Sequence, residues 1–208
     1  MKSITEYEIR ELAMSWGLEY SALRAVIEVE SAGSGFFLDS DGVWKPKILF
    51  EAHYMWKRLQ ARGINPALLN QYHPDLCHKK WDPKTYPYGT TSQQYTKILN
   101  IILWAQKHYP DKWESYKKAA YESASWGAMQ VMGANYAECG YANIYDFKHA
   151  MEVSEKSQIE ISLKWMRNNG LLKKLQNKQW TLFAAGYNGI GKVMDYSKKL
   201  RTAYSKYS

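Results

Sequence analysis

The chain has 208 residues, 46% of them hydrophobic, which suits one domain with a substantial core. It contains no run of roughly 18 apolar residues, so no transmembrane helix is predicted, and its N-terminus lacks the apolar segment of a signal peptide. The net charge of +8 favours an anionic partner, such as nucleic acid, an anionic membrane surface or an acidic cell-wall polymer.

Most of the chain shows the periodicity of helices, beginning at the N-terminus. Thr5 and Glu8 form a capping box that predicts a first helix to about Trp16. Ser21 is expected to cap a second helix, which ends near Gly33. A short hairpin follows, because two apolar segments flank a polar, glycine-containing turn over residues 36–44.

The rest of the chain is also predicted to be mainly helical. Helices are expected over residues 47–62, just after Asn65-Pro66, and over 93–108, 112–122, a short segment after Ser125, 143–168, 179–187 and 192–206. Residues 72–91 are rich in proline and are expected to form an irregular loop. Long loops in compact domains are often functional.

Glu30 is the most informative residue of the chain. Three apolar residues precede it on the same helical face: Leu23, Val26 and Ile27. A carboxylate therefore stands where a fourth hydrophobic residue is expected. Burial and the negative end of the helix dipole both favour its protonated form, which makes Glu30 a candidate general acid near neutral pH. Glu28 lies off this face and is expected to pair with Arg24, four residues before it.

Glu51 is the preferred second carboxylate. It follows Glu30 by 21 residues, and the hairpin between them can fold its helix back beside the first. Two carboxyl groups facing each other across a cleft are what glycosidic bond cleavage requires. Asp39 and Asp41 in the hairpin are rival candidates. A structural ion pair or a helix cap is the alternative role for Glu51.

Other catalytic chemistries have little support in the sequence. Cys77 and Cys139 are expected to be free thiols, and no spacing of Cys and His suggests a zinc site, so we expect neither a metal nor another cofactor. His53 has no partner at metal-ligand spacing, which favours a substrate contact or a hydrogen bond. Ser31 and Ser125 have no His or Asp placed to activate them as nucleophiles.

Five motifs occur in the order typical of one group of enzymes. They are Glu-Ser-Ala-Gly-Ser-Gly-Phe at 30–36, Pro-Lys-Ile-Leu-Phe-Glu-Ala-His at 46–53, Tyr-Gly at 88–89, Ser-Ala-Ser-Trp-Gly-Ala-Met-Gln-Val-Met-Gly at 123–133 and Tyr-Asn-Gly at 187–189. Together they resemble the phage endolysin N-acetylmuramidases, which belong with goose-type lysozymes and lytic transglycosylases in the lysozyme-like superfamily. The resemblance extends from about residue 20 to the end of the chain.

This resemblance implies a mainly α, lysozyme-like fold with a small β-hairpin beside the active-site cleft. It implies cleavage of the β-1,4 bond between N-acetylmuramic acid and N-acetylglucosamine in peptidoglycan, for lysis of a host cell. We expect residues 1–208 to form a single muramidase domain, in which residues 1–20 supply an N-terminal helix and no separate wall-binding module precedes it.

The resemblance also assigns roles to individual residues. Glu30 takes the position of the catalytic acid, and Glu51 falls on the carboxylate of the family's Phe-Glu-x-His motif. The residues expected to contact the glycan are Ser31, Gln130, Tyr187 and Asn188, with His53, Tyr88, Gly89 and Trp126 as further candidates. An amide, a hydroxyl and a phenol suit the N-acetyl and hydroxyl groups of a sugar.

The expected partners follow from the same interpretation. They are peptidoglycan strands, with no nucleic acid and with the protein as a monomer. We expect synthesis in the host cytoplasm and action on the wall after release. The basic C-terminal helix, with Lys198, Lys199 and Arg201, is a candidate for weak contact with an anionic outer membrane, and a solvated helical face is the plainer alternative.

Several functional alternatives stay open from the sequence. We expect hydrolysis with inversion, but the motifs also suit a lytic transglycosylase, in which the sugar's own hydroxyl attacks and leaves a 1,6-anhydro end. A non-catalytic glycan-binding protein and a basic nucleic-acid binder are alternatives from other classes. The presence of Glu30 argues against the first, and the lack of a nucleic-acid motif argues against the second.

Overall fold

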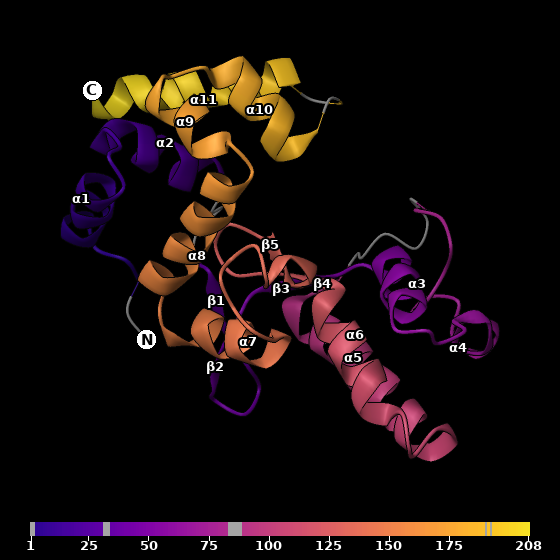
Figure 1. The fold of residues 1–208 in the computed structure, drawn as a ribbon. Coiled ribbons are helices and arrows are strands. Elements are labelled where there is room, and N and C mark those ends of the chain that lie inside the picture. Colours follow the sequence, from indigo (N-terminus) through magenta and orange to yellow (C-terminus); the bar gives the residue numbers. More distant parts are fainter. Residues whose placement is uncertain (1–2, 31–33, 83–88, 190, 192) are drawn as a thin grey trace.

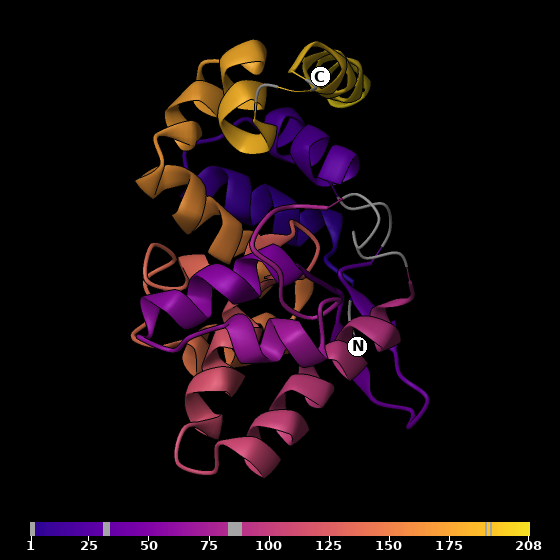
Figure 2. The same cartoon turned by 90° about the vertical axis from the view of Figure 1, so that its right-hand side faces the viewer.

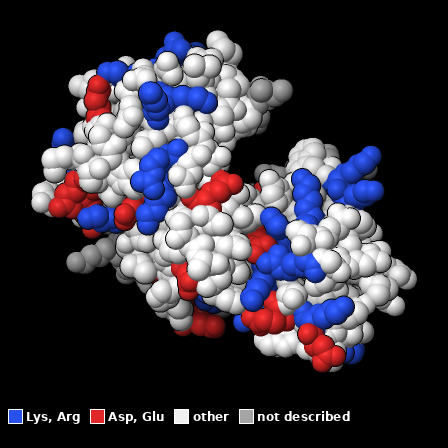
Figure 3. All heavy atoms as spheres, in the orientation of Figure 1, with Lys and Arg blue, Asp and Glu red and all other residues white. Residues whose placement is uncertain are grey.

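The computed structural model describes residues 3–30, 34–82, 89–189, 191 and 193–208 (Figure 1). Its helices form two groups around a small central sheet, and a deep hollow separates the groups on the face shown in Figure 3. One group holds the N-terminal and C-terminal helices, and the other holds the helices of the middle of the chain. The predicted mainly helical fold with a small β component is confirmed.

The first group is built on helix α2 (Tyr20–Glu30), along which the C-terminal helix α11 (Val193–Tyr207) packs (Figures 1 and 2). Helices α1 (Glu6–Ser15), α9 (Leu171–Gln176) and α10 (Trp180–Asn188) complete it. The predicted capping box of α1 is confirmed. The predicted cap of α2 is wrong, because α2 already begins at Tyr20 and Ser21 lies inside its first turn. Helix α9 was not predicted.

The acidic residues of α2 find their partners on other helices. Glu28 accepts hydrogen bonds from Lys206 and Tyr207 of α11, and Arg24 pairs with Glu6 of α1 at 3.0 Å. The ion pair that Glu28 could form with Arg24 is therefore not made, although the charge of Arg24 still helps to lower the pKa of Glu28 after the hydrogen bonds from Lys206 and Tyr207. Arg24 and Glu28 pair with residues of neighbouring helices instead of with each other. The bonds of Glu28 to Lys206 and Tyr207 join the C-terminal helix to α2.

The predicted hairpin is present as strands β1 (Phe36–Leu38) and β2 (Trp44–Pro46). The next segment differs from the prediction, because residues 48–50 form strand β3 (Ile48–Phe50) and helix α3 (Ala52–Ala61) begins only afterwards. Strand β3 pairs with β4 (Ala124–Trp126), which replaces the short helix predicted after Ser125 and pairs in turn with β5 (Val131–Met132). A short apolar run does not distinguish a buried strand from part of a helix.

The remaining helices follow the predictions, except that one predicted helix is divided in two. They are α4 (Ala67–Tyr72), α5 (Thr91–His108), α6 (Trp113–Glu122), α7 (Ile144–Val153) and α8 (Glu155–Asn168), with a 3-10 turn over Gly133–Asn135. The single helix predicted over 143–168 is wrong, because Ser154 is extended and its hydroxyl accepts a hydrogen bond from the Ser157 amide at 3.1 Å, which caps α8. No helix in the described part of the chain combines the length and apolar character needed to cross a bilayer.

The two cysteines lie in the core. Cys77 and Cys139 are free and fully buried, as predicted for thiols that form no disulfide. Burial raises the pKa of both thiols to about 12.

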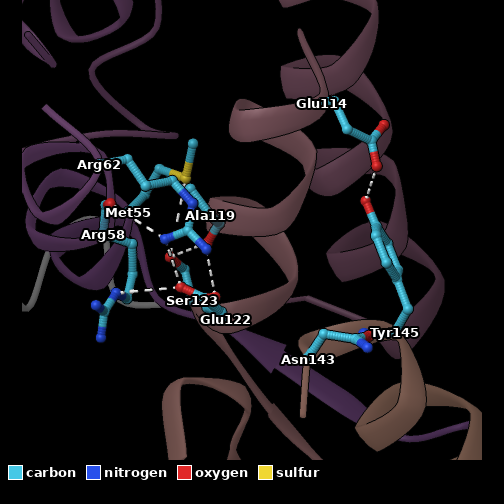
Figure 4. Close-up of polar contacts among 9 residues, drawn as sticks. All are labelled: Met55, Arg58, Arg62, Glu114, Ala119, Glu122, Ser123, Asn143 and Tyr145. Carbon is cyan, nitrogen blue, oxygen red and sulfur yellow. Dashed lines mark hydrogen bonds and ion pairs between the residues drawn. The ribbon is translucent and has the colours of Figure 1, made fainter. Parts of the chain in front are cut away.

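A buried carboxylate joins α3 to α6 (Figure 4). Glu122 is 2% exposed and accepts hydrogen bonds from both terminal nitrogens of Arg62, while Nε of Arg58 lies 3.3 Å from Glu122 Oε2. The next residue, Ser123, accepts a hydrogen bond from the Glu51 amide at 2.9 Å. The arginines therefore hold the last turn of α3 against the end of α6, and the bond from the Glu51 amide holds its start.

We predict that Glu122→Gln lowers the free energy of unfolding by roughly 2–3 kcal/mol, since it leaves two arginines without their buried partner. Chemical denaturation measures this loss. The matched control is Glu152→Gln on α7, which removes an exposed pair with Lys148 and should cost less than about 1 kcal/mol. Equal losses in the two variants would contradict the structural role of Glu122.

Candidate active site

Glu30 is the last residue of α2 and is half-buried. The three apolar residues of its helical face lie in the core, with exposures of 0% for Leu23, 0% for Val26 and 5% for Ile27. Its carboxylate accepts hydrogen bonds from the hydroxyl of Tyr196 in α11 and from the side chain of Asn188 at the end of α10. The end of α2 therefore meets two helices from the other end of the chain, α10 and α11, at this one carboxyl group.

The surroundings of Glu30 favour its protonated form. Burial raises the pKa of Glu30 above its usual range, and the hydrogen bonds from Tyr196 and Asn188 act in the opposite direction without cancelling this effect. A carboxyl group that retains its proton closer to neutral pH can protonate a leaving group. The structure thus gives Glu30 the properties of a general acid.

An aromatic stack supports the residues that hold Glu30. The rings of Tyr187 and Tyr196 lie parallel with centroids 6.1 Å apart, and Phe183 stacks on Tyr187 at 5.4 Å. Trp165 of α8 meets Tyr187 edge-on at 5.7 Å. Burial raises the pKa of Tyr187 well above its usual value, so its phenol stays protonated and donates a hydrogen bond to the Met129 carbonyl at 3.0 Å.

Gln130 lies in the turn between β4 and β5, where its backbone φ of 49° is in the left-handed region. Its side chain is held at both ends: the Ser125 hydroxyl donates to Oε1 at 2.8 Å, and Nε2 donates to the Gly127 carbonyl at 2.8 Å. The residue is nevertheless exposed. The turn therefore presents an amide of fixed orientation to solvent.

A pocket of about 280 Å³ joins these residues. Its lining consists of Glu30, Tyr54, Met129, Gln130, Val131, Met132, Asn135, Trp165, Tyr187 and Asn188. Four residues predicted from the sequence thus come together, namely Glu30, Gln130, Tyr187 and Asn188. Tyr54 belongs to α3 in the second group of helices, so the pocket extends between the two groups. The space-filling view shows the hollow between them, with acidic side chains near its inner end (Figure 3).

Glu51 occupies the N-cap position of α3, but its side chain makes no capping hydrogen bond. Burial raises the pKa of Glu51, and the positive charge of Lys57 only partly offsets this effect. His53 Nε2 lies 3.5 Å from Glu51 Oε2, and the pKa of His53 is lowered, first by burial and then by Lys57 and His78. The pair therefore consists of a desolvated carboxyl group beside an imidazole that favours its neutral form.

Glu51 does not itself line the pocket at Glu30, but its helix reaches that pocket through Tyr54. The pKa of Tyr54 is raised, first by burial and then by the negative charge of Glu51. The rival carboxylates have a different setting. Asp39 is hydrogen-bonded by the ammonium group of Lys45, which lowers the pKa of Asp39, and Asp41 is exposed in the hairpin turn.

The other predicted residues lie elsewhere. Trp126 is completely buried in the sheet and donates its indole N–H to the Tyr121 carbonyl at 3.0 Å, so its ring packs the core and does not reach the cleft. Gly89 is exposed beside Thr90, which caps α5. Ser31 and Tyr88 lie outside the described residues.

Sequence reasoning missed three aromatic residues of the site, namely Tyr54, Trp165 and Tyr196. Their only signal in the sequence is the high aromatic content of 15%. Among the residues that the structure describes, no group of three or more His, Cys, Asp or Glu side chains could hold a metal ion.

A desolvated carboxyl group above a pocket of amide, phenol and indole side chains suits acid-catalysed cleavage of a glycosidic bond, so the site has the character of a glycoside hydrolase. The N-acetylmuramidase family model matches residues 19–208, and the chain belongs to this family. The crystal structure of the Burkholderia AP3 phage endolysin is similar, with a TM-score of 0.80 and 32% sequence identity over 99% of this chain and 71% of that chain. No curated protein matches the sequence. The family resemblance predicted from the motifs is confirmed.

We predict that Tyr196→Phe raises the pKa of Glu30 further, because the lost hydrogen bond favours the charged carboxylate. Titration of the Glu30 carboxyl carbon by NMR measures the change. Tyr204→Phe is the matched control on the same helix, since its hydroxyl donates to Glu19 instead. A Glu30 pKa that falls or stays constant in Tyr196→Phe would show that this hydrogen bond does not tune the acid.

Proposed function

We propose that this N-acetylmuramidase is an endolysin that cleaves the β-1,4 bond between N-acetylmuramic acid and N-acetylglucosamine in bacterial peptidoglycan. The observation that carries the proposal is the raised pKa of Glu30 at the edge of a pocket lined by groups suited to sugars. The family match and the similarity to a phage endolysin support it.

In the proposed reaction, Glu30 donates its proton to the glycosidic oxygen as the bond to the anomeric carbon breaks. Tyr196 and Asn188 already donate hydrogen bonds to this carboxyl group, and they stabilise the carboxylate that proton transfer leaves behind. Positive charge develops on the sugar ring at the same time. The Glu30 carboxylate then lies beside that charge and stabilises it.

Glu51 is the proposed base that directs a water molecule to the opposite face of the sugar. It lies on α3, the helix that supplies Tyr54 to the pocket. Glu51 must be deprotonated to act as a base, and its pKa is raised by burial. Activity should therefore fall as the pH falls through the pKa of Glu51. Attack by water from the opposite face inverts the configuration at the anomeric carbon.

The remaining pocket residues are proposed to orient the glycan. The fixed amide of Gln130 can both donate and accept hydrogen bonds with an N-acetyl group, and the rings of Tyr187 and Trp165 provide apolar surface for a sugar ring. Ser31, Tyr88 and Gly89 stay proposed contacts from the family resemblance, and His53 stays a proposed contact because it has no partner at metal-ligand spacing in the sequence. Trp126 is omitted because its ring is buried.

Three further predictions concern the setting of the reaction. We propose that the protein is a monomer, that it is made in the host cytoplasm and that it acts on the wall after release. Weak contact of α11 with an anionic outer membrane also stays a proposal. Arg201 donates to Thr181 and Lys206 to Glu28, so Lys198 and Lys199 would supply most of the free charge for such contact.

We predict that Glu30→Gln lowers the rate of peptidoglycan hydrolysis by about 10²–10⁴-fold, because the amide cannot donate an acidic proton. The assay measures reducing ends released from purified peptidoglycan. Glu11→Gln, which removes a partly exposed carboxylate on α1 that pairs with Lys156, is the control and should retain full activity. Equal activity of Glu30→Gln and the wild type would refute the assignment, and 1,6-anhydro ends as the product would identify a transglycosylase.

We predict that the first product carries the α configuration at the new reducing end and that Glu51→Gln lowers kcat by about 10²-fold or more. Proton NMR of the early reaction distinguishes the two anomers before they equilibrate. Asp41→Asn, in the exposed turn of the hairpin, serves as the control for loss of a carboxylate. A β product would replace inversion with retention, and unchanged kcat in Glu51→Gln would remove Glu51 from the mechanism.

A further inference from the structure

A second hollow of about 890 Å³ opens beside Glu30 and continues away from the proposed sugar pocket. The residues that matter in its lining are Glu30, Asn188, Asp195, Tyr196, Lys198 and Lys199. Glu30 and Asn188 line both hollows, so the two adjoin at the proposed catalytic acid. A smaller hollow of about 390 Å³ lies along the same pair of lysines, between α11 and the end of α2.

The charge of this hollow is distinctive. Lys198 and Lys199 are exposed, and in the described part of the chain neither forms an ion pair, whereas Lys206 and Lys178 are each paired with a glutamate of the α2 region. Asp195 lies on the same helix but forms no ion pair with either lysine in the described structure. Two lysines that form no ion pair in the described structure therefore line a hollow that reaches Glu30, and the Asp195 carboxylate lines the same hollow.

The proposed substrate carries an anionic group that fits this position. The lactyl group on the third carbon of the muramyl ring bears a peptide, and that peptide has free carboxylates. The bond to be cleaved begins at the first carbon of the same ring. The peptide must therefore leave the cleft close to the acid that protonates this bond. The N-acetylglucosamine on the other side of the scissile bond carries no such substituent, so of the two sugars that this bond joins, only the muramyl residue carries a peptide.

We infer that the hollow lined by Lys198 and Lys199 binds the carboxylates of the peptide attached to the muramyl residue. The inference rests on the proposed muramidase function and extends it from the glycan to its peptide. Each lysine contributes a point charge at an exposed site, so the contacts are modest individually and weaken with salt. They favour strands that carry peptides over bare glycan and fix which sugar occupies the position beside Glu30.

The test compares the wild type with the double variant Lys198→Gln/Lys199→Gln on two substrates. One is soluble uncross-linked peptidoglycan strands, and the other is the same strands after an amidase has removed the peptides, which leaves only the lactyl carboxylate as an anionic group on each muramyl ring. The readout is kcat/KM for release of reducing ends at low salt. We expect the double variant to lose about three- to tenfold on peptide-bearing strands and to match the wild type on bare strands.

Two further variants control this comparison. Lys107→Gln/Lys112→Gln removes the same charge near the junction of α5 and α6, in the other group of helices, and should show no selective loss (Figure 1). Lys198→Arg/Lys199→Arg keeps the charge and should retain the preference for peptide-bearing strands. Added salt should reduce the difference between the wild type and the glutamine variant on peptide-bearing strands.

Two results would overturn the inference while the proposed function stands: equal losses on both substrates, or no loss on either. In the second case, a loss that the double variant shows only in the lysis of intact cells would assign the lysines to membrane contact. A wild type that releases no reducing ends from either substrate would instead refute the proposed function, and the inference with it.

Discussion

Two buried polar side chains of α8 hold the loops on which the site depends. Glu155 accepts hydrogen bonds from the Ser34 hydroxyl at 2.7 Å and the Gly35 amide at 2.6 Å, just beyond Glu30. Gln158, one turn later, accepts from the Ala128 amide at 2.8 Å in the turn that presents Gln130. A Cβ on Gly35 would lie 2.1 Å from Gln158 Oε1, and one on Gly127 would lie 2.7 Å from the same atom. Gly35 and Gly127, which belong to two separate motifs, thus both pack against Gln158 of α8. Because neither has a side chain, both loops can lie close to this helix.

The site also depends on the C-terminal helix. A carboxyl group buried at the end of α2 needs hydrogen-bond donors, and α11 supplies Tyr196 at the same time as it closes the core over α2. The same contact therefore stabilises the fold and sets the proton affinity of Glu30. Since burial raises the pKa of Glu30 and the hydrogen bond from Tyr196 lowers it, the packing of α11 on α2 sets the balance between the two effects.

Local patterns in the sequence predicted much of this arrangement. The apolar face ending in Glu30, the capping box at Thr5 and the hairpin depend on neighbouring residues, and the five motifs identified the family. The strands at 48–50 and 124–126 were predicted as helix because three-residue apolar runs carry no clear period. Tyr196 escaped notice because it meets Glu30 across 166 residues. Trp126 belongs to one of the five motifs, yet its side chain is completely buried and packs in the core at strand β4.

The burial of Cys77 and Cys139 has a consequence for where the enzyme can work. With a thiol pKa of about 12, on the order of one thiol in 10⁵ is ionised at neutral pH, and the thiolate is the form that oxidants and disulfides attack. Both sulfur atoms are also shielded from solvent in the folded chain. The fold therefore has the same covalent structure in reducing and in oxidising surroundings, and it needs no oxidative maturation to reach its active form.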